Sequence, residues 1–245
     1  MHEHEAWPAA LLNRFLAGPA DSILNAVGLR PADPAHPWAN WLAFELIVFL
    51  FIIVLFAFLR PRLSVDKPGA LQHIMEILYN FVGGEASDNI DHHADRYVPF
   101  FGTLFIYILF MNLIGIIPGF ESPTMNPAVP AGLAVATFLF YNWTGLREHG
   151  VGRYLAHFAG PMPILAPLMI PIELISHLAR PLSLTVRLYA NMFAGEQVTL
   201  AFLGITYLVI PSVFMGLHVF VSFLQAYIFT LLTIIYVSGA VAHEH

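Results

Sequence analysis

The sequence predicts an all-α membrane protein with five transmembrane helices and one amphipathic helix. The last two spans are expected to be long, tilted and paired as a hairpin. Hydrophobic residues make up 58% of the chain and charged residues only 11%, whereas soluble domains carry roughly 25% charge. Several apolar stretches also reach the roughly 20 residues needed to cross about 30 Å of hydrocarbon. Lipid is therefore the expected solvent of most of the chain.

Residues 1–40 are expected to form an N-terminal tail on the outer side, and residues 41–245 the integral membrane domain. The tail mixes Pro, Ala, His and acidic residues, has room for one short helix, and lacks the basic start and apolar core of a signal peptide. Its HEHE start has no third fixed ligand. We therefore expect no metal site there.

The first membrane helix is predicted from Trp41 to Leu59, because this apolar run ends where charge and a helix breaker coincide at Arg60, Pro61 and Arg62. An amphipathic helix follows, since apolar residues recur at intervals of three and four opposite a polar face. These apolar positions are Leu71, Ile74, Met75, Leu78, Phe81 and Val82.

Four more crossings complete the predicted membrane domain. The second runs from Tyr97 to Ile117 and ends in a Pro-Gly turn signal, and the third runs from about Ala128 to Trp143. The fourth and fifth, from Met162 to Leu203 and from Ile205 to Val241, are far longer than a perpendicular crossing needs. These two segments are therefore expected to be tilted helices that form a hairpin.

The distribution of basic residues predicts the orientation, because short cytoplasmic loops are enriched in Lys and Arg. The loops around residues 120–126 and 204–212 contain none. With five crossings, the N-terminus is expected outside and the C-terminus in the cytoplasm. The basic loop residues on the expected cytoplasmic side are Arg60, Arg62, Lys67, Arg96, Arg147 and Arg153.

The fourth crossing contains ionisable residues, each charged type costing about 2.5 to 3.5 kcal/mol at the centre of a membrane helix. Arg187 lies near the middle, too deep to reach the headgroups easily, and its guanidinium stays charged. It therefore requires a carboxylate or a water-lined cavity. Arg180 can equally be a structural partner of a nearby acid. Helical spacing places one polar stripe along this segment, formed by Glu173, His177, Arg180, Arg187 and Asn191, whereas Glu196 points away.

The fifth crossing carries its own polar residues on one helical face, namely His218, Ser222, Gln225 and Tyr236. A hairpin would bring Glu196 near His218 toward the outer side, where a carboxyl and an imidazole can exchange protons with water near neutral pH. Glu173 and His177 would then lie toward the cytoplasmic end. Polar residues would then give water access to the membrane domain from each side, with the fixed cation of Arg187 between the two paths.

Three strings carry a family resemblance: RPLSLTVRLYANMFAGE, LQAYIFTLLTIIYVSGAVAHEH and, upstream, NLIGIIPGFESPT. They resemble subunit a of F-type (F1Fo) ATP synthases, and the resemblance covers the chain from about Trp41 onward. It implies two half-channels beside a rotating c-ring, with Arg187 as the essential arginine. By motif position, Glu173 matches an inner-path acid, and the outer-path residues are Asn191, Glu196, His218 and Gln225.

The resemblance also implies partners and a location. The partners are the c-subunit ring, b-type peripheral stalk subunits, the rest of the F1Fo complex and membrane lipid, in a bacterial-type cytoplasmic (inner) membrane. The chain is expected not to be catalytic alone and to need no cofactor or metal. One stretch departs from the family pattern, because Met125, Pro127 and Pro130 stand where a Leu/Thr-rich helix start is common.

Composition excludes several other functions. The chain has no Cys, a net charge of -6 and a single lysine, Lys67, which argues against thiolate metal sites and nucleic acid. No GxxxxGK loop is present, so nucleotide is not expected to bind this chain.

A secondary transporter or channel using the intramembrane Arg, Glu and His set is the main alternative. A haem-bearing subunit and an intramembrane hydrolase are further alternatives, although neither facing His pairs nor hydrolase motifs are evident.

Overall fold

The computed structural model describes residues 6–26, 37–65, 67–90, 94–117, 119–157, 166–203 and 209–242. All regular structure in these ranges is helical, which agrees with the predicted all-α class. Short 3-10 turns also occur, among them η3 (Ile114–Ile116) and η4 (Pro123–Met125). The α-helices in chain order are α1 (Trp7–Ala26), α2 (Asn40–Leu59), α3 (Ala70–Asn89), α4 (Val98–Leu113), α5 (Ala128–His157), α6 (Ala166–Leu203) and α7 (Val209–Val241).

Three helical stretches of the described chain are long and apolar enough to cross a membrane. They are Asn40–Arg62, Val98–Ile116 and Ser212–Val241, with mean hydropathies of 3.1, 1.9 and 2.0. They correspond to the first, second and fifth predicted crossings. The helices α5 and α6, expected to be the third and fourth, contain more polar residues, and their crossing stays a prediction.

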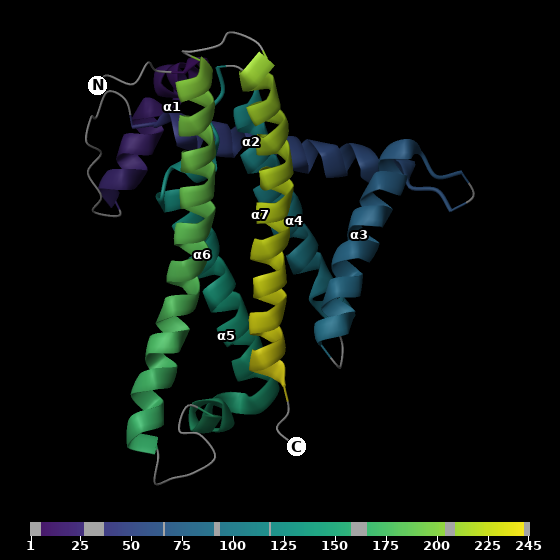
Figure 1. Cartoon of the computed structure of the whole chain (residues 1–245), viewed down its shortest axis with the longest axis vertical. Helices are drawn as coiled ribbons and strands as arrows, with labels where there is room; N and C mark the ends of the chain where they lie inside the picture. Colours follow the sequence, from purple (N-terminus) through teal and green to yellow (C-terminus); the bar gives the residue numbers. More distant parts are fainter. Residues whose placement is uncertain are drawn as a thin grey trace.

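The long helices form the centre of the fold. In Figure 1, α6 and α7 run side by side, α5 lies behind them, and α4 packs against α7. Their shared core is made of large apolar side chains with almost no exposed surface, among them Phe105, Ile108, Leu188, Met192 and Phe229. This packing holds the polar stripes of α6 and α7 in fixed register.

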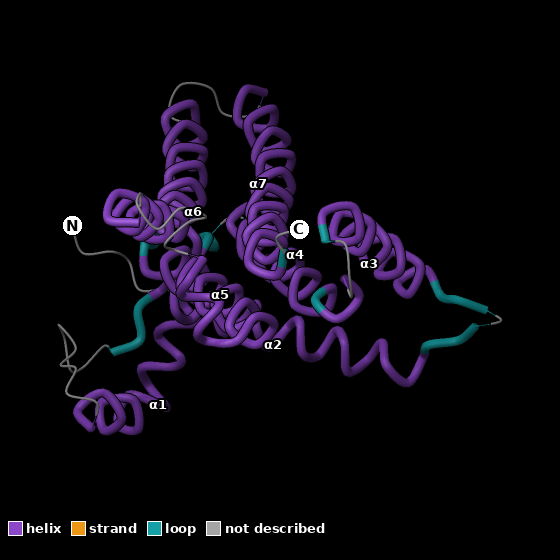
Figure 2. Tube along the Cα trace, turned by 90° about the horizontal axis from the view of Figure 1, so that it is seen from below, coloured by secondary structure: helices purple, strands orange, loops and turns teal. Residues whose placement is uncertain are grey.

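The helix α2 lies across α6 and α7 rather than along them in both views (Figures 1 and 2). Figure 2 shows α1 at one end of α2 and α3 at the other. A helix, α3, is present where the amphipathic helix was predicted, and it turns Val82 and Ala86 into the core. Ile74 and Phe81 of the predicted apolar face are 52% and 38% exposed, so the amphipathic character stays a prediction. The helix continues to Asn89, beyond the predicted apolar positions.

The N-terminal segment contains a helix of 20 residues, longer than the short helix expected. It packs on α2, and two side-chain amides fasten it there. Asn13 Nδ2 donates to the Trp38 carbonyl at 3.1 Å, and Asn40 Oδ1 accepts from the Ala6 amide at 2.9 Å. These long-range bonds stabilise a helix whose own composition signals it only weakly.

The helix α5 extends past the predicted end of the third crossing at Trp143, to His157. Gly150 interrupts it with a φ of 75°, a left-handed conformation that suits glycine. The chain turns there, and Tyr154 returns to donate a hydrogen bond to Asn142 Oδ1 at 2.7 Å. Burial raises the pKa of the Tyr154 phenol to about 12, so the hydroxyl remains a donor at neutral pH.

Candidate functional site

Arg187 lies half-buried near the middle of α6. The adjacent Leu188 is fully buried in the core, whereas the side chain of Val186 is 53% exposed. Arg187 thus sits at the border between the packed face of α6 and its open face. Within the described ranges, the ion pairs found involve Glu173 with His177 and Arg180, and none involves Arg187. The guanidinium is therefore available to a group from outside this chain.

One turn beyond Arg187, a hydrogen bond joins α6 to α7. Asn191 Nδ2 donates to Gln225 Oε1 at 2.8 Å. Gln225 is only 2% exposed, and its Nε2 atom is buried without a hydrogen-bond partner in the described chain. The two amides predicted on separate helices are thus brought together, and one buried donor remains for a water molecule or another ligand.

His218 contacts α6 at the residue preceding Glu196. A Cβ atom built on Gly195 would lie 3.5 Å from His218 Nδ1. The imidazole also contacts the backbone of Asn112 in α4, and its Nε2 is buried with no hydrogen-bond partner among the described residues. Glu196 is half-buried and interacts electrostatically with the exposed Glu121. His218 and Glu196 therefore both lie near the turn that follows α4.

The predicted inner-path residues form a second cluster nearer the N-terminal end of α6. His177 Nδ1 lies 3.3 Å from Glu173 Oε1, and an Arg180 guanidinium nitrogen lies 4.0 Å from the same oxygen. His177 is 8% exposed. Arg180 therefore does have the structural role considered for it, as a partner of Glu173. Arg187 is separated from this cluster along α6.

Two tyrosines complete the second cluster, and the sequence had not singled out Tyr141. The Arg180 guanidinium lies 5.2 Å from the ring centre of Tyr236 and 5.8 Å from that of Tyr141. Tyr141 also lies 5.7 Å from the His177 ring. The aromatic faces thus contribute to holding the Arg180 cation, in addition to the Glu173 carboxylate. A Tyr within an apolar run is hard to recognise as a site residue from sequence, because its pattern is the same as that of a residue in the hydrophobic core.

The sequence also did not predict a chain of buried, hydrogen-bonded hydroxyl groups near η4. Ser122 Oγ donates to the Met111 carbonyl or shares its proton with Thr124 Oγ1, at 2.8 and 2.7 Å. Thr124 Oγ1 donates to Asn112 Oδ1 at 2.7 Å, while Asn112 Nδ2 is buried without a hydrogen-bond partner in the described chain. Asn112 could have been found from sequence, since an amide inside an apolar span is costly unless it is bonded.

Metal ligation has no support in the described residues, where no group of three or more His, Cys, Asp or Glu lies close enough to hold an ion. The polar groups instead offer carboxylates, imidazoles and amides at successive points along α6 and α7. The carboxylates and imidazoles can take up and release protons, and the amides can bind water.

Comparison with known proteins identifies the family. A family model described as "ATP synthase A chain" matches residues 42–238. The chain belongs to this family. Similar proteins are ATP synthase subunit a of Solibacter usitatus (strain Ellin6076), 62% identical over 235 residues, and that of Koribacter versatilis (strain Ellin345), 49% identical over 242 residues. The alignments cover 96% of this chain and 100% of the first relative, and 99% of both chains for the second.

Membership of the ATP synthase subunit a family confirms the resemblance inferred from the arginine string. The chain is a proton-translocating membrane subunit of the Fo sector and is not itself catalytic. A third relative, ATP synthase subunit a 1 of Syntrophotalea carbinolica, is 42% identical over 235 residues, which are 96% of each chain. The similarity thus extends over the whole of α2 to α7.

Proposed function

We propose that Arg187 is the fixed cation that separates two aqueous half-channels in this subunit a. The observation that carries the proposal is its position: half-buried in the middle of α6, with no carboxylate of the described chain paired to it. Because an arginine keeps its charge in proteins, such a site attracts an acid supplied by another polypeptide. That acid is a carboxylate of the c-ring, beside which subunit a works in the F1Fo complex.

The outer half-channel runs past His218 and Glu196 to Asn191 and Gln225. Support comes from the contact of His218 with Gly195, the hydrogen bond between the two amides, and the buried nitrogens His218 Nε2 and Gln225 Nε2, which have no hydrogen-bond partner in the described chain. Buried donors without partners are rare, and ordered water is their usual partner. Water lines this path in the proposal.

The inner half-channel begins at Glu173 and His177. Their 3.3 Å contact places a carboxylate and an imidazole together near the N-terminal end of α6, on the opposite side of Arg187 from His218. A proton arriving on this side can be released to water through either group. The two access paths are therefore offset along the α6 and α7 pair.

The direction of proton movement follows from the charges of Arg187 and of the ring carboxylate. A ring carboxylate beside Arg187 is favoured in its ionised form, so it releases its proton into one half-channel. Away from Arg187 it meets lipid, where only the protonated acid is tolerable, so it must first take a proton from the other half-channel. Arg187 also repels a proton that would cross directly between the channels. Proton flow is thereby coupled to ring rotation.

The proposed topology has five crossings, formed by α2, α4, α5, α6 and α7, with α3 as an amphipathic helix. The side-by-side course of α6 and α7, lying across α2, supports a strongly tilted hairpin (Figure 1). Residues 1–40 lie outside and the C-terminus lies in the cytoplasm, in a bacterial inner membrane. The basic residues after α2 and in the second half of α5 support this orientation.

The proposed partners include b-type stalk subunits and lipid. The support is the second half of α2, whose apolar side chains this chain leaves exposed all round the helix. Contiguous exposed apolar surface marks a membrane or protein contact. The exposed apolar side chains of α2 include Phe49, Leu50, Phe51, Ile53, Val54, Phe56 and Phe58.

The substitution Arg187→Ala tests the central role in proteoliposomes that contain the whole complex. ATP-driven proton pumping is expected to be lost, because the ring carboxylate would have no fixed cation to meet. Arg147→Ala, which removes a guanidinium near the end of α5, is the control and should pump normally. Pumping retained in Arg187→Ala would contradict the assigned role.

A further inference from the structure

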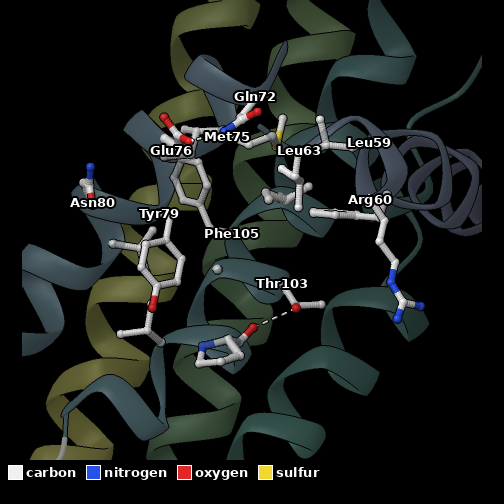
Figure 3. A pocket seen from close by; sticks show the side chains of 17 residues that line it. Leu59, Arg60, Leu63, Gln72, Met75, Glu76, Tyr79, Asn80, Thr103 and Phe105 are labelled. Atoms are coloured by element: carbon white, nitrogen blue, oxygen red, sulfur yellow. Dashed lines mark hydrogen bonds between the residues drawn. The ribbon is translucent and has the colours of Figure 1, made fainter. Parts of the chain in front are cut away.

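A cavity separates the end of α2 from α3, and no part of the proposed proton path uses it. Its volume is about 570 Å³, and its walls come from α2, α3 and α4 (Figure 3). The helices α2 and α3 both pack against α4, on either side of this space. The cavity is partly open to the surroundings of the chain, so in a membrane it is filled by lipid or by a neighbouring protein.

The chemistry of the walls indicates a hydrocarbon chain. Apolar side chains line most of the cavity, including Leu59 of α2, Met75 of α3 and Phe105 of α4. Gly102 also lines it, and a Cβ atom placed there would meet nothing within 4 Å. The wall at Gly102 is therefore open to an occupant.

The size argues against a partner helix. An α-helix about 10 Å across with a pitch of 5.4 Å fills roughly 400 Å³ per turn. The cavity would hold little more than one turn, whereas a slender acyl chain fits along it. Ligand sites commonly have volumes of about 300 to 1,000 Å³.

A cation stands at the edge of the cavity. Arg60 lines the cavity at the end of α2, on the side away from Glu76 of α3, and its guanidinium points outward from the cavity (Figure 3). The Glu76 carboxylate is already bound by Gln72 Nε2 at 2.7 Å. Arg60 has no ion pair within the described ranges. Arg62 and Lys67 follow at the same end of α2 and add positive charge.

We propose that this cavity binds one acyl chain of an anionic phospholipid, with the lipid phosphate held by Arg60 in the leaflet where α2 ends. Arg suits phosphate because its planar fork gives two parallel charge-assisted hydrogen bonds. Basic pockets beside membrane helices are recognised sites of anionic lipid binding. The lipid fills the space between α2 and α3 and joins both to α4.

A single introduced thiol tests the proposal, because the native chain has no Cys. Gly102→Cys in the whole complex carries a photoactivatable crosslinker, and the complex is placed in vesicles of phosphatidylglycerol and phosphatidylcholine. The adduct on this chain is then identified by mass spectrometry. We expect a phospholipid adduct with about tenfold preference for phosphatidylglycerol, because both lipids carry a phosphate but only phosphatidylcholine also carries a cation that Arg60 repels.

Arg60→Gln, combined with Gly102→Cys, should abolish the preference, whereas Arg147→Gln in the same background should leave it intact. Raising the salt to about 1 M in the Gly102→Cys parent should reduce the preference without any change at Arg60. Adducts with a neighbouring subunit, equal yields from the two lipids, or a preference that survives Arg60→Gln would each overturn the proposal. Proton pumping is not measured, so the result is independent of the role proposed for Arg187.

Discussion

Gly195 determines how closely His218 can approach α6. The absence of a side chain leaves only ordinary contact distance, 3.5 Å, between a hypothetical Cβ and His218 Nδ1. Anything larger than a methyl group would have to displace the imidazole. The position of His218 in the proposed outer half-channel therefore depends on a residue without a side chain.

The pair Gly195→Ala and Gly195→Leu tests this dependence. We expect Ala to be tolerated and Leu to reduce passive proton conduction through Fo by up to about 100-fold, the cost of moving a working group by about 1 Å. Conduction is measured in vesicles after the soluble F1 sector has been removed. Equal conduction in the two variants would show that the spacing at Gly195 is unimportant.

Sequence reasoning located residues best where a charge interrupts an apolar run. Arg187 was singled out in this way, because an unpaired cation in a membrane helix is expensive, and its role stays a prediction. Glu45 lies in a similar run but was not singled out. The structure pairs it with Tyr107, whose hydroxyl donates to Glu45 Oε1 at 3.1 Å. The two residues are 62 positions apart, and helical periodicity within one segment cannot predict such a partner.

At the scale of elements, the contact of α5 with α7 has little spare room. A Cβ atom on Gly145 would lie 2.5 Å from Tyr154 Cε2 and 3.0 Å from the Ala240 carbonyl oxygen. The tyrosine ring comes from beyond the Gly150 turn in the same helix, while Ala240 belongs to the last turn of α7. The glycine therefore allows three segments to meet at one point.

Gly145→Ala is expected to destabilise this contact by about 1 to 3 kcal/mol, as overpacking does in close-packed interiors. The thermal midpoint of the purified complex should fall. Gly132→Ala serves as the matched change in α5, because a Cβ atom there meets nothing within 4 Å. A midpoint that falls equally in both variants would rule out the packing explanation.

The apolar helices were the most predictable elements. The bounds of α2 followed from an uninterrupted hydrophobic run that ends at Arg60 and Pro61. The α-helix of the second crossing ends at Leu113, earlier than predicted, and the predicted start of the fifth crossing at Ile205 lies outside the described residues. The length of α1 and the continuation of α5 past Trp143 did not follow. Both depend on tertiary contacts, such as those of Asn13 and Tyr154, that no local pattern encodes.

At the scale of the whole molecule, orientation in the membrane is the main expectation to be measured. Ser87 of α3 is exposed on the expected cytoplasmic side, and Glu121 is exposed on the expected outer side. Because the native chain lacks Cys, Ser87→Cys and Glu121→Cys each introduce a unique thiol. An impermeant thiol reagent should label the first in inside-out vesicles and the second in right-side-out vesicles.

The native chain has no thiol and is the negative control for this labelling experiment. Both thiols reacting from the same side would contradict the predicted odd number of crossings between them. A reversed pattern would keep the crossings but invert the chain. The charge distribution that predicted the orientation is a statistical bias, whereas labelling reports each loop directly.

The amide pair between α6 and α7 has one more consequence. Carboxamides give and accept hydrogen bonds but neither gain nor lose a proton near neutral pH. In the proposed outer half-channel, Asn191 and Gln225 therefore do not carry the proton themselves, and a proton moving from His218 toward Arg187 would travel through neighbouring water. Their 2.8 Å hydrogen bond would then orient the chain of water molecules that carries the proton, without itself taking part in the transfer.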